Sequence, residues 1–157
     1  GGGIVYRGQV ITGQQAIAGE WGHMSIDPNG PVCYCKTNGC VEVFISGGGV
    51  ENRYSDKWSI RKTMPQIEKD YYAGDKKACE IINAFFGHFG RAMANLINIL
   101  DPDIVVLGGG VSNFADVYTK GVEEVRKRVF SDSLETPIVK HRLGDSAGVL
   151  GAAFIGL

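Results

Sequence analysis

The stretch that decides the fold is ACEIINAFFGHFGRAMANLINILDPDIVVLGGGVSN, residues 78–113. Its first part carries apolar residues at three- and four-residue steps up to Leu100, which is the pattern of one buried helical face. Asp101-Pro102 ends this helix, because proline disfavours helical geometry in the residue before it. The apolar run Ile104–Leu107 then predicts a buried strand that leads into three glycines. The stretch therefore predicts a long helix over about residues 75–100, followed by a strand.

Downstream of the glycines, helical and extended patterns continue to alternate. A second helix is expected from about Phe114 to Phe130, with Asn113 as its N-cap. TPIVKHRL at residues 136–143 predicts a strand, and GDSAGVLGAAFIGL at residues 144–157 predicts a closing helix rich in small residues. Such alternation implies an α/β domain whose sheet is at least partly parallel.

The part of the chain before the long helix shows less periodicity. Two short β-prone runs flank Arg7-Gly8 and predict a hairpin. Residues 13–46 predict mostly loop with short strands, and residues 47–74 predict shorter helices and a mobile connection. The total of 157 residues, without an internal repeat or an interdomain linker, suits one domain.

Composition and charge argue against several classes of function. Sixteen basic and seventeen acidic residues give a net charge of −1, so no nucleic-acid partner is expected. No apolar run approaches the ~20 residues needed to cross a bilayer, so no membrane partner is expected either. Three of the four cysteines are grouped within residues 33–40, and the fourth, Cys79, lies in the helical pattern. This distribution predicts reduced thiols and a cytoplasmic location.

GEWGHMSIDPNGPVCYCKTNGCVE, residues 19–42, predicts a metal site. His23, Cys33, Cys35 and Cys40 supply one imidazole and three thiolates, a common set in structural zinc sites. Soft sulfur and borderline nitrogen favour zinc over magnesium or calcium. The alternative is a group of buried or reactive cysteines, since C-x-C-x4-C is not the commoner C-x2-C spacing. Four protein ligands would leave no open coordination position, so the predicted zinc is structural rather than catalytic.

Two carboxylates flank the predicted ligands. Glu20 precedes His23 by three residues, and Glu42 follows Cys40 by two. Pinned carboxylates suit a polyhydroxylated ligand, because each can accept hydrogen bonds from two hydroxyls. The alternative for each glutamate is a solvated surface charge, and neighbouring Trp21 suits either core packing or stacking on a sugar.

The glycines after the predicted strand form a second candidate site. VVLGGGVSN, residues 105–113, predicts a strand, a glycine turn and the start of a helix. This arrangement lets a nucleotide approach the main chain and lets backbone N–H groups face an anion. It matches neither the Walker pattern nor G-x-G-x-x-G in full, so a tight strand-to-helix connection is the alternative.

In combination, GEWGH, CYCKTNGCVE and DPDIVVLGGGVSN resemble the ROK family of sugar kinases and sugar-responsive repressors. The resemblance covers essentially all 157 residues, and GEWGH, CYC, FISG and ETP are most similar to the bacterial fructokinase or mannofructokinase branch. It implies an α/β fold, the second lobe of an actin-like ATPase (ribonuclease H-like) fold with a zinc-binding loop. Sugar and ATP would lie in the cleft between the two lobes.

The resemblance also implies roles for individual residues. Glu20, His23 and Glu42 would hydrogen-bond the sugar, and His23 would also join the three cysteines on zinc. Five glycines would contact the nucleotide, two near its phosphates and three at its adenosine end: Gly2, Gly3, Gly108, Gly109 and Gly110. The family usually has glycine directly after the second cysteine, where this chain has Lys36; this departure bears on the local turn and not on the ligands.

The implied activity belongs to a longer protein. Residues 1–157 would be the C-terminal lobe, without the N-terminal lobe that carries the catalytic aspartate, so no catalytic residue is assigned and this segment alone is expected to be inactive. The intact protein, expected to be a homo-oligomer such as a dimer, would use ATP and Mg²⁺ to phosphorylate a hexose, with fructose and its 6-hydroxyl as the first expectation. The alternatives are an N-acetylhexosamine kinase and the sugar-sensing effector domain of a ROK repressor.

Overall fold

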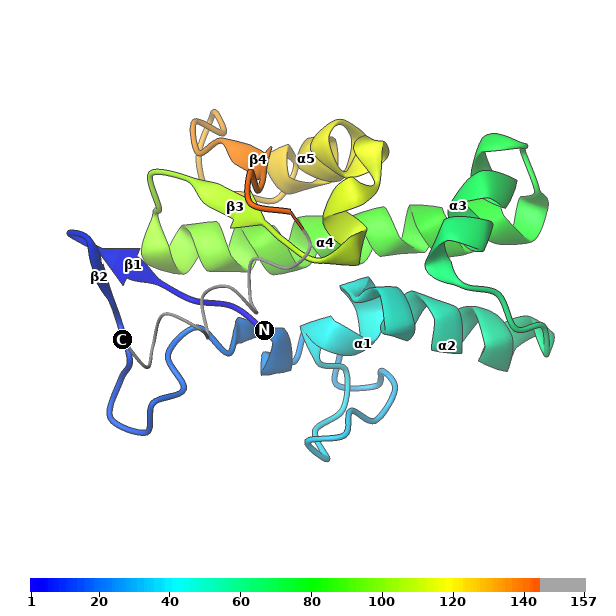
Figure 1. The fold of residues 1–157 in the computed structure, drawn as a ribbon, viewed down its shortest axis with the longest axis horizontal. Coiled ribbons are helices and arrows are strands. Elements are labelled where there is room, and N and C mark those ends of the chain that lie inside the picture. Colours follow the sequence, from blue (N-terminus) through cyan, green and yellow to red (C-terminus); the bar gives the residue numbers. More distant parts are fainter. Residues whose placement is uncertain (145–157) are drawn as a thin grey trace.

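Helix α4 (Lys76–Leu100) runs through the centre of the molecule, and the four other α-helices of the described residues pack against it (Figure 1). The structure is a computed structural model that describes residues 1–144. The closing helix expected at residues 144–157 lies outside the described residues except for Gly144. Among the described residues, no helix is long and apolar enough to cross a bilayer.

The long helix is confirmed, and its ends follow from its sequence. The Asp75 side chain accepts a hydrogen bond from the backbone N–H of Ala78 at 2.9 Å and so caps the N-terminus. At the other end Asp101 adopts a left-handed conformation with φ of +42° directly before Pro102, which stops the helix. Most of the predicted apolar face is buried, whereas Leu96 is half-buried and Leu100 is 40% exposed. The buried members are Ala78, Ile81, Ile82, Phe85, Phe86, Phe89, Met93 and Ile97.

Short helices cover α4 from one side. α1 (Val41–Ile45) and α2 (Gly47–Trp58) run along one flank, and α3 (Met64–Tyr72) packs near the N-terminal end of α4 (Figure 1). Helices α2 and α3 confirm the shorter helices predicted for residues 47–74. Ser46 caps α2 by accepting from the Gly49 backbone N–H, and Thr63 begins α3 with a capping box.

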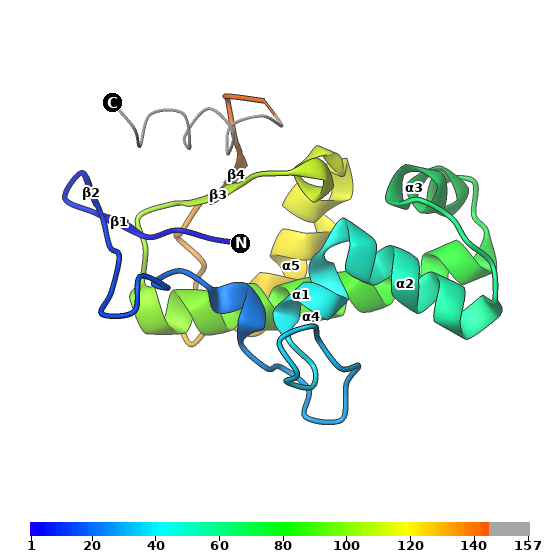
Figure 2. The same ribbon diagram turned by 60° about the horizontal axis from the view of Figure 1, so that its bottom comes forward.

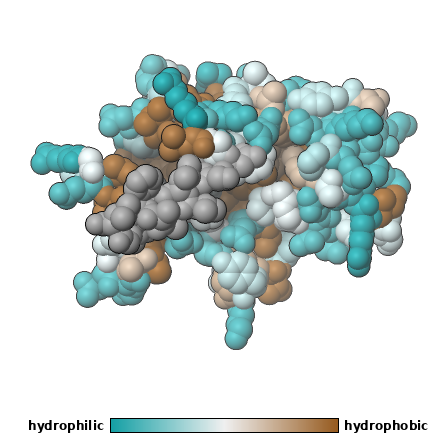
Figure 3. All heavy atoms as spheres, in the orientation of Figure 1, coloured by the Kyte–Doolittle hydropathy of each residue, from teal (hydrophilic) through white to brown (hydrophobic). Residues whose placement is uncertain are grey.

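The opposite flank of α4 carries the strands and the last helix. β3 (Val105–Leu107) pairs in parallel with β4 (Ile138–Lys140), and α5 (Lys120–Arg126) connects them along the chain and packs on α4. The predicted parallel pairing is therefore confirmed, with both strands shorter than expected. Figure 3 has the orientation of Figure 1 and shows apolar patches over the half of the molecule that contains β1 to β3.

The N-terminal hairpin is also confirmed. β1 (Val5–Tyr6) pairs antiparallel with β2 (Gln9–Val10), and the turn between them consists of Arg7 and Gly8. Both turn residues have positive φ, +51° and +78°, as a two-residue turn of type I′ requires.

The single helix predicted from Phe114 to Phe130 is wrong. Two 3₁₀ turns, η2 (Gly110–Asn113) and η3 (Ala115–Tyr118), precede the short α5, so Asn113 ends a turn and is not an N-cap. Tertiary packing overrides the local periodicity, because Phe114 is buried against the aromatic residues of α4 and the backbone of α5 comes close to the Phe89 ring at Gly121. The far end of the predicted helix lies in solvent, with Phe130 94% exposed.

Residues 13–40 are mostly loop, as expected, but Val41–Ile45 form helix α1 instead of continuing the loop to residue 46, and the short strands expected in this segment are wrong. The segment contains the 3₁₀ turn η1 (Trp21–His23) and two isolated bridges, Ser25 with Cys40 and Val32 with Asn38. Turns that contain glycine or proline interrupt the extended backbone, so that no continuous β-ladder forms among these residues. The loop between η1 and α1 projects from the body of the molecule in Figures 1 and 2.

Candidate functional site

The projecting loop brings the four predicted metal ligands together. The ligand atoms of His23, Cys33, Cys35 and Cys40 all lie within 4.8 Å of one another. Cys33 Sγ is 3.7 Å from His23 Nδ1, and Cys35 Sγ is 3.5 Å from Cys40 Sγ. Ligands about 2.0–2.3 Å from a central zinc ion lie roughly 3.3–3.8 Å apart in a tetrahedron. The arrangement therefore suits such an ion, and no disulfide competes, since all four cysteines of the chain are free.

The loop backbone reaches this arrangement through a close crossing at Gly39. Its φ is +65°, and a Cβ here would lie 1.7 Å from the carbonyl oxygen of Asp27. The backbone of Gly39 bonds on both sides, donating its N–H to Pro31 and accepting from the N–H of Ile26. Only glycine fits this crossing, which delivers Cys40 to the other ligands.

The turn between the cysteines forms although glycine is missing from it. The backbone N–H of Lys36 donates to the carbonyl of Cys33 at 2.8 Å, and the N–H of Cys33 donates to Thr37 at 2.9 Å. Lys36 adopts φ of +70°, a left-handed conformation that costs a residue with a side chain about 1–2 kcal/mol. The departure from glycine therefore leaves the turn in place, because Lys36 takes the left-handed conformation that glycine favours.

The thiols differ in burial and therefore in acidity. Cys33 and Cys40 are buried, whereas Cys35 is exposed. Burial raises the pKa of the Cys40 thiol to about 12, with the neighbouring Cys35 and Cys33 thiols adding to the shift. Hydrogen bonds with Thr37 lower the pKa of Cys35 to about 6. Without a cation Cys40 is thus a thiol at neutral pH, and a bound divalent ion is what would ionise it.

His23 faces the ligands with one nitrogen and the outside with the other. Nδ1 points toward Cys33 Sγ, while Nε2 lies 2.9 Å from the Tyr34 hydroxyl and 3.9 Å from Glu42 Oε2. Glu20 lies one residue before η1, and its backbone carbonyl accepts a hydrogen bond from the His23 N–H. Reduced solvation, followed by the charges of Glu42 and Glu20, raises the pKa of Tyr34. The carboxylates and the imidazole therefore gather at one edge of the loop.

Helix α4 supports the loop from beneath. Arg91 Nη1 donates to the carbonyl of Ile26 at 3.0 Å. The His88 ring stacks on Phe44 of α1, with centroids 4.0 Å apart and planes 19° from parallel. Burial, together with the charges of Arg53 and Arg91, lowers the pKa of His88 to about 4. His88 is thus a neutral packing residue at physiological pH.

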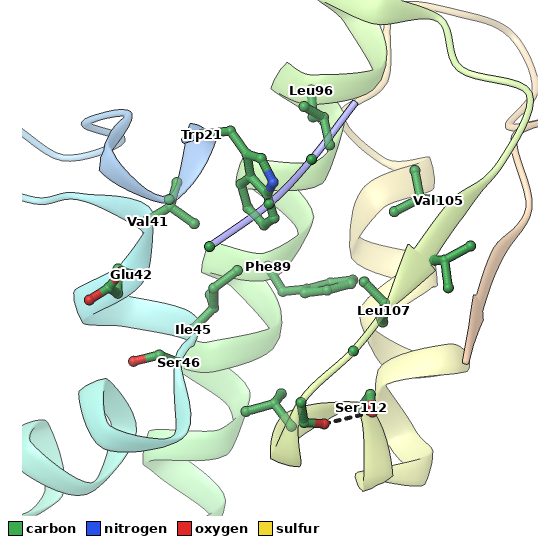
Figure 4. A pocket seen from close by; sticks show the side chains of 18 of the residues that line it. Trp21, Val41, Glu42, Ile45, Ser46, Phe89, Leu96, Val105, Leu107 and Ser112 are labelled. Carbon is green, nitrogen blue, oxygen red and sulfur yellow. Dashed lines mark hydrogen bonds between the residues drawn. The ribbon is translucent and has the colours of Figure 1, made fainter. Parts of the chain in front are cut away.

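A cavity of ≈ 440 Å³ lies beside the loop, between the N-terminal segment, α1 and β3 (Figure 4). Its apolar floor includes Trp21, Ile45, Phe89 and Leu107, and Glu42 and Ser46 contribute polar groups. All five glycines predicted to contact a nucleotide line it: Gly2, Gly3, Gly108, Gly109 and Gly110.

The two glycine groups reach the cavity for different reasons. A Cβ on Gly2 would lie 2.2 Å from Trp21 Nε1, so the N-terminal segment passes the indole at close range. Gly109 has φ of +73°, and its carbonyl accepts from the buried Ser112 hydroxyl at 2.7 Å. Among residues 1–144, no atom beyond the chain neighbours lies within 4 Å of a Cβ built on Gly108, Gly109 or Gly110. The helix expected after these glycines is only the 3₁₀ turn η2, so the case for an anion site at a helix N-terminus does not hold here.

Comparison with known proteins assigns this fold. Residues 1–156 match the sequence profile of the ROK family. The chain belongs to the ROK family. The N-acetyl-D-glucosamine kinase of Vibrio atlanticus is 36% identical over 167 residues, which cover 100% of this chain and 55% of the relative. The ROK chain therefore spans about half the length of the curated relatives it matches.

Solved ROK structures share the architecture. The ROK hexokinase from Thermus thermophilus is 33% identical with a TM-score of 0.85, covering 96% of this chain and 51% of its own. A ROK transcriptional regulator homologous to the Escherichia coli MLC protein is 28% identical with a TM-score of 0.76, covering 98% and 42%. The expected actin-like ATPase fold of the family is thereby confirmed.

Sequence reasoning overlooked one residue at the site. Tyr34 contacts His23 through both its hydroxyl and its ring, with ring centroids 5.1 Å apart and planes perpendicular. Its position between Cys33 and Cys35 was the available signal, because a side chain flanked by two ligands of one ion is carried to the rim of the metal site.

Proposed function

We propose that this chain is the second lobe of an ATP-dependent hexose kinase. The observation that carries the proposal is the convergence of His23 Nε2 and Glu42, 3.9 Å apart, beside a cavity lined by both glycine groups. Hexose hydroxyls suit this edge, since a carboxylate accepts and an imidazole N–H donates. The hexokinase and N-acetyl-D-glucosamine kinase names of the ROK relatives give the same reaction class.

In this proposal the chain's own residues orient the sugar. Glu42 and Glu20 accept from hexose hydroxyls, and His23 donates from Nε2. The 6-hydroxyl would then attack the γ-phosphate of ATP in line, with Mg²⁺ on the phosphates and a carboxylate base supplied by the other lobe. Correct orientation alone can lower a barrier by about 7–11 kcal/mol. The five glycines leave space for the nucleotide to approach the main chain.

Zinc would act as the structural ion of the loop. Three sulfurs and one imidazole nitrogen fit its preferred ligand set, and as ligands they would occupy all four positions of a tetrahedron. When bound, zinc fixes His23 and the segment that leads from Cys40 to Glu42. We place the enzyme in the cytoplasm as a homo-oligomer, a location that the free thiols favour.

The identity of the hexose separates two candidates. Fructose is the expectation from the sequence motifs, and N-acetylglucosamine is favoured by the relatives at 36% identity. The test is the rate of ATP-dependent phosphorylation of fructose, mannose, glucose and N-acetylglucosamine by the two-lobed protein. Turnover of at least one hexose is expected, with none by the isolated 157 residues. Absence of turnover on every hexose by the zinc-loaded two-lobed protein would contradict the proposal.

A sugar-sensing repressor is the second candidate, because a ROK transcriptional regulator shares the fold at 28% identity. Both functions use the same sugar-binding loop, so this lobe alone does not separate them. A DNA-binding segment in the rest of the protein, with sugar-dependent retardation of DNA in a gel, would favour the repressor over the kinase.

A further inference from the structure

His23 Nε2 already has a hydrogen-bond partner within the chain. The Tyr34 hydroxyl lies 2.9 Å from it, closer than Glu42 Oε2 at 3.9 Å. With Nδ1 directed at the cysteine sulfurs and used as the metal ligand, the ring proton of a neutral imidazole is on Nε2. Nε2 is then a donor, and the Tyr34 oxygen is the acceptor.

One imidazole N–H makes one good hydrogen bond, so Tyr34 and a sugar hydroxyl exclude each other on Nε2. We propose that Tyr34 is a latch on His23: its hydroxyl holds Nε2 while the sugar is absent, and a hexose hydroxyl displaces it on binding. This inference rests on the proposed sugar-binding role of His23. Tyr34 would be a positioning residue that acts through His23 and lowers the apparent affinity for the hexose.

The surroundings of the Tyr34 side chain allow it to rotate away from His23. The side chain is 77% exposed, and its hydroxyl hydrogen bond and its ring contact are both with His23. Its backbone lies in the turn closed by the bond from the Lys36 N–H to the Cys33 carbonyl. A rotation about the Tyr34 side-chain bonds therefore frees Nε2 without moving the two flanking cysteines, and water can satisfy the released hydroxyl.

The first test removes only the hydroxyl, with Tyr34→Phe in the zinc-loaded two-lobed protein. A single neutral hydrogen bond that must be broken corresponds to about a two- to tenfold effect on affinity. We expect the KM for the hexose to fall by about that factor, with kcat and zinc content unchanged. Tyr72→Phe is the matched control, because it removes an exposed tyrosine hydroxyl that bonds Asp116 on the other side of the molecule. An unchanged or raised KM in Tyr34→Phe would overturn the latch.

A second test observes His23 directly. The ¹⁵N chemical shift of His23 Nε2 should differ between wild type and Tyr34→Phe without sugar, and the two should converge at saturating hexose. A difference that persists at saturation would show that Tyr34 stays bonded, which overturns the latch. Hexose binding of equal strength to both proteins overturns the latch alone, whereas failure of every hexose to bind the wild type overturns the proposed function as well.

Discussion

The metal loop, residues 19–42, and helix α4 reach defined structures by different means. Helix α4 buries eleven residues along one face and carries its own N-cap. The loop has few buried apolar side chains, among them Ile26, and depends on two isolated bridges, a glycine crossing and four clustered ligand atoms. The helix is therefore stabilised mainly by the hydrophobic effect, and the loop by local backbone geometry and, in our proposal, by a zinc ion. The candidate metal ligands and sugar-binding residues all lie in the loop.

Among the substitutions that test this comparison, Phe85→Ala is expected to cause the largest loss of stability. Phe85 is fully buried in α4 and contacts the rings of Phe86, Phe89 and Phe114. Loss of this ring should lower the free energy of unfolding by about 3–5 kcal/mol, measured by urea denaturation. The exposed Asn83→Ala on the same helix should change it by less than about 0.5 kcal/mol. Equal effects of the two substitutions would refute the view that α4 is held by its apolar face.

The loop should be most sensitive at its backbone crossing. Gly39→Ala adds strain at positive φ and a direct clash with the Asp27 carbonyl, so we expect a loss of more than about 2 kcal/mol together with weaker zinc binding. Gly74→Ala is the control, because Gly74 has φ of +80° but a Cβ at this position would meet no atom within 4 Å. This control should cost only about 1 kcal/mol. A metal affinity unaffected by Gly39→Ala would contradict the role of the crossing.

The contact between α4 and α1, the helix that follows the loop, should be pH-dependent through His88. Its pKa is about 4 in the folded chain and about 6.5 in the unfolded chain. The unfolded state therefore binds more protons between these values, and stability falls as pH decreases from 6.5 to 4. With allowance for solvent screening the loss is about 1–2 kcal/mol. Chemical denaturation across this range should show that the free energy of unfolding depends less on pH in His88→Phe than in the wild type. Equal pH dependence in the two proteins would contradict the role given to His88.

The smallest effect is expected at the start of α4. Asp75→Ala removes the side-chain acceptor for the Ala78 N–H and should cost about 1 kcal/mol. Asp75→Asn should retain most of the stability, since an asparagine oxygen caps as well. Thermal denaturation of the three proteins provides the comparison, and a loss of equal size in both variants would argue against capping.

Much of the fold was predictable because its signals are local. The periodicity of α4, the helix-ending Asp101-Pro102 and the positive-φ turn at Arg7-Gly8 each determine their own element. The prediction of a helix over 114–130 was wrong because the positions of Phe114 and Gly121 are determined by packing against α4, which is distant in sequence. Periodicity within a segment carries no information about such a partner.

The candidate site was likewise predictable only in part. Residue type and close grouping in the sequence together predicted that His23 and the three cysteines would lie together. Their spacing did not reveal that Tyr34 would bond the second nitrogen of His23, or that η2 would be a single 3₁₀ turn. Both depend on how the backbone turns at Lys36 and Gly109, which is decided by tertiary contacts.

The central claim is that a closed zinc site orders the loop that carries the sugar-binding groups. Zinc analysis combined with amide hydrogen exchange, before and after chelation, tests it most directly. We predict one zinc per chain, and faster exchange after chelation at the loop amides of Ile26, Cys33 and Gly39, while the amides of α4 stay protected. A reduced protein that binds no zinc, or loop amides that exchange equally slowly without it, would contradict the claim.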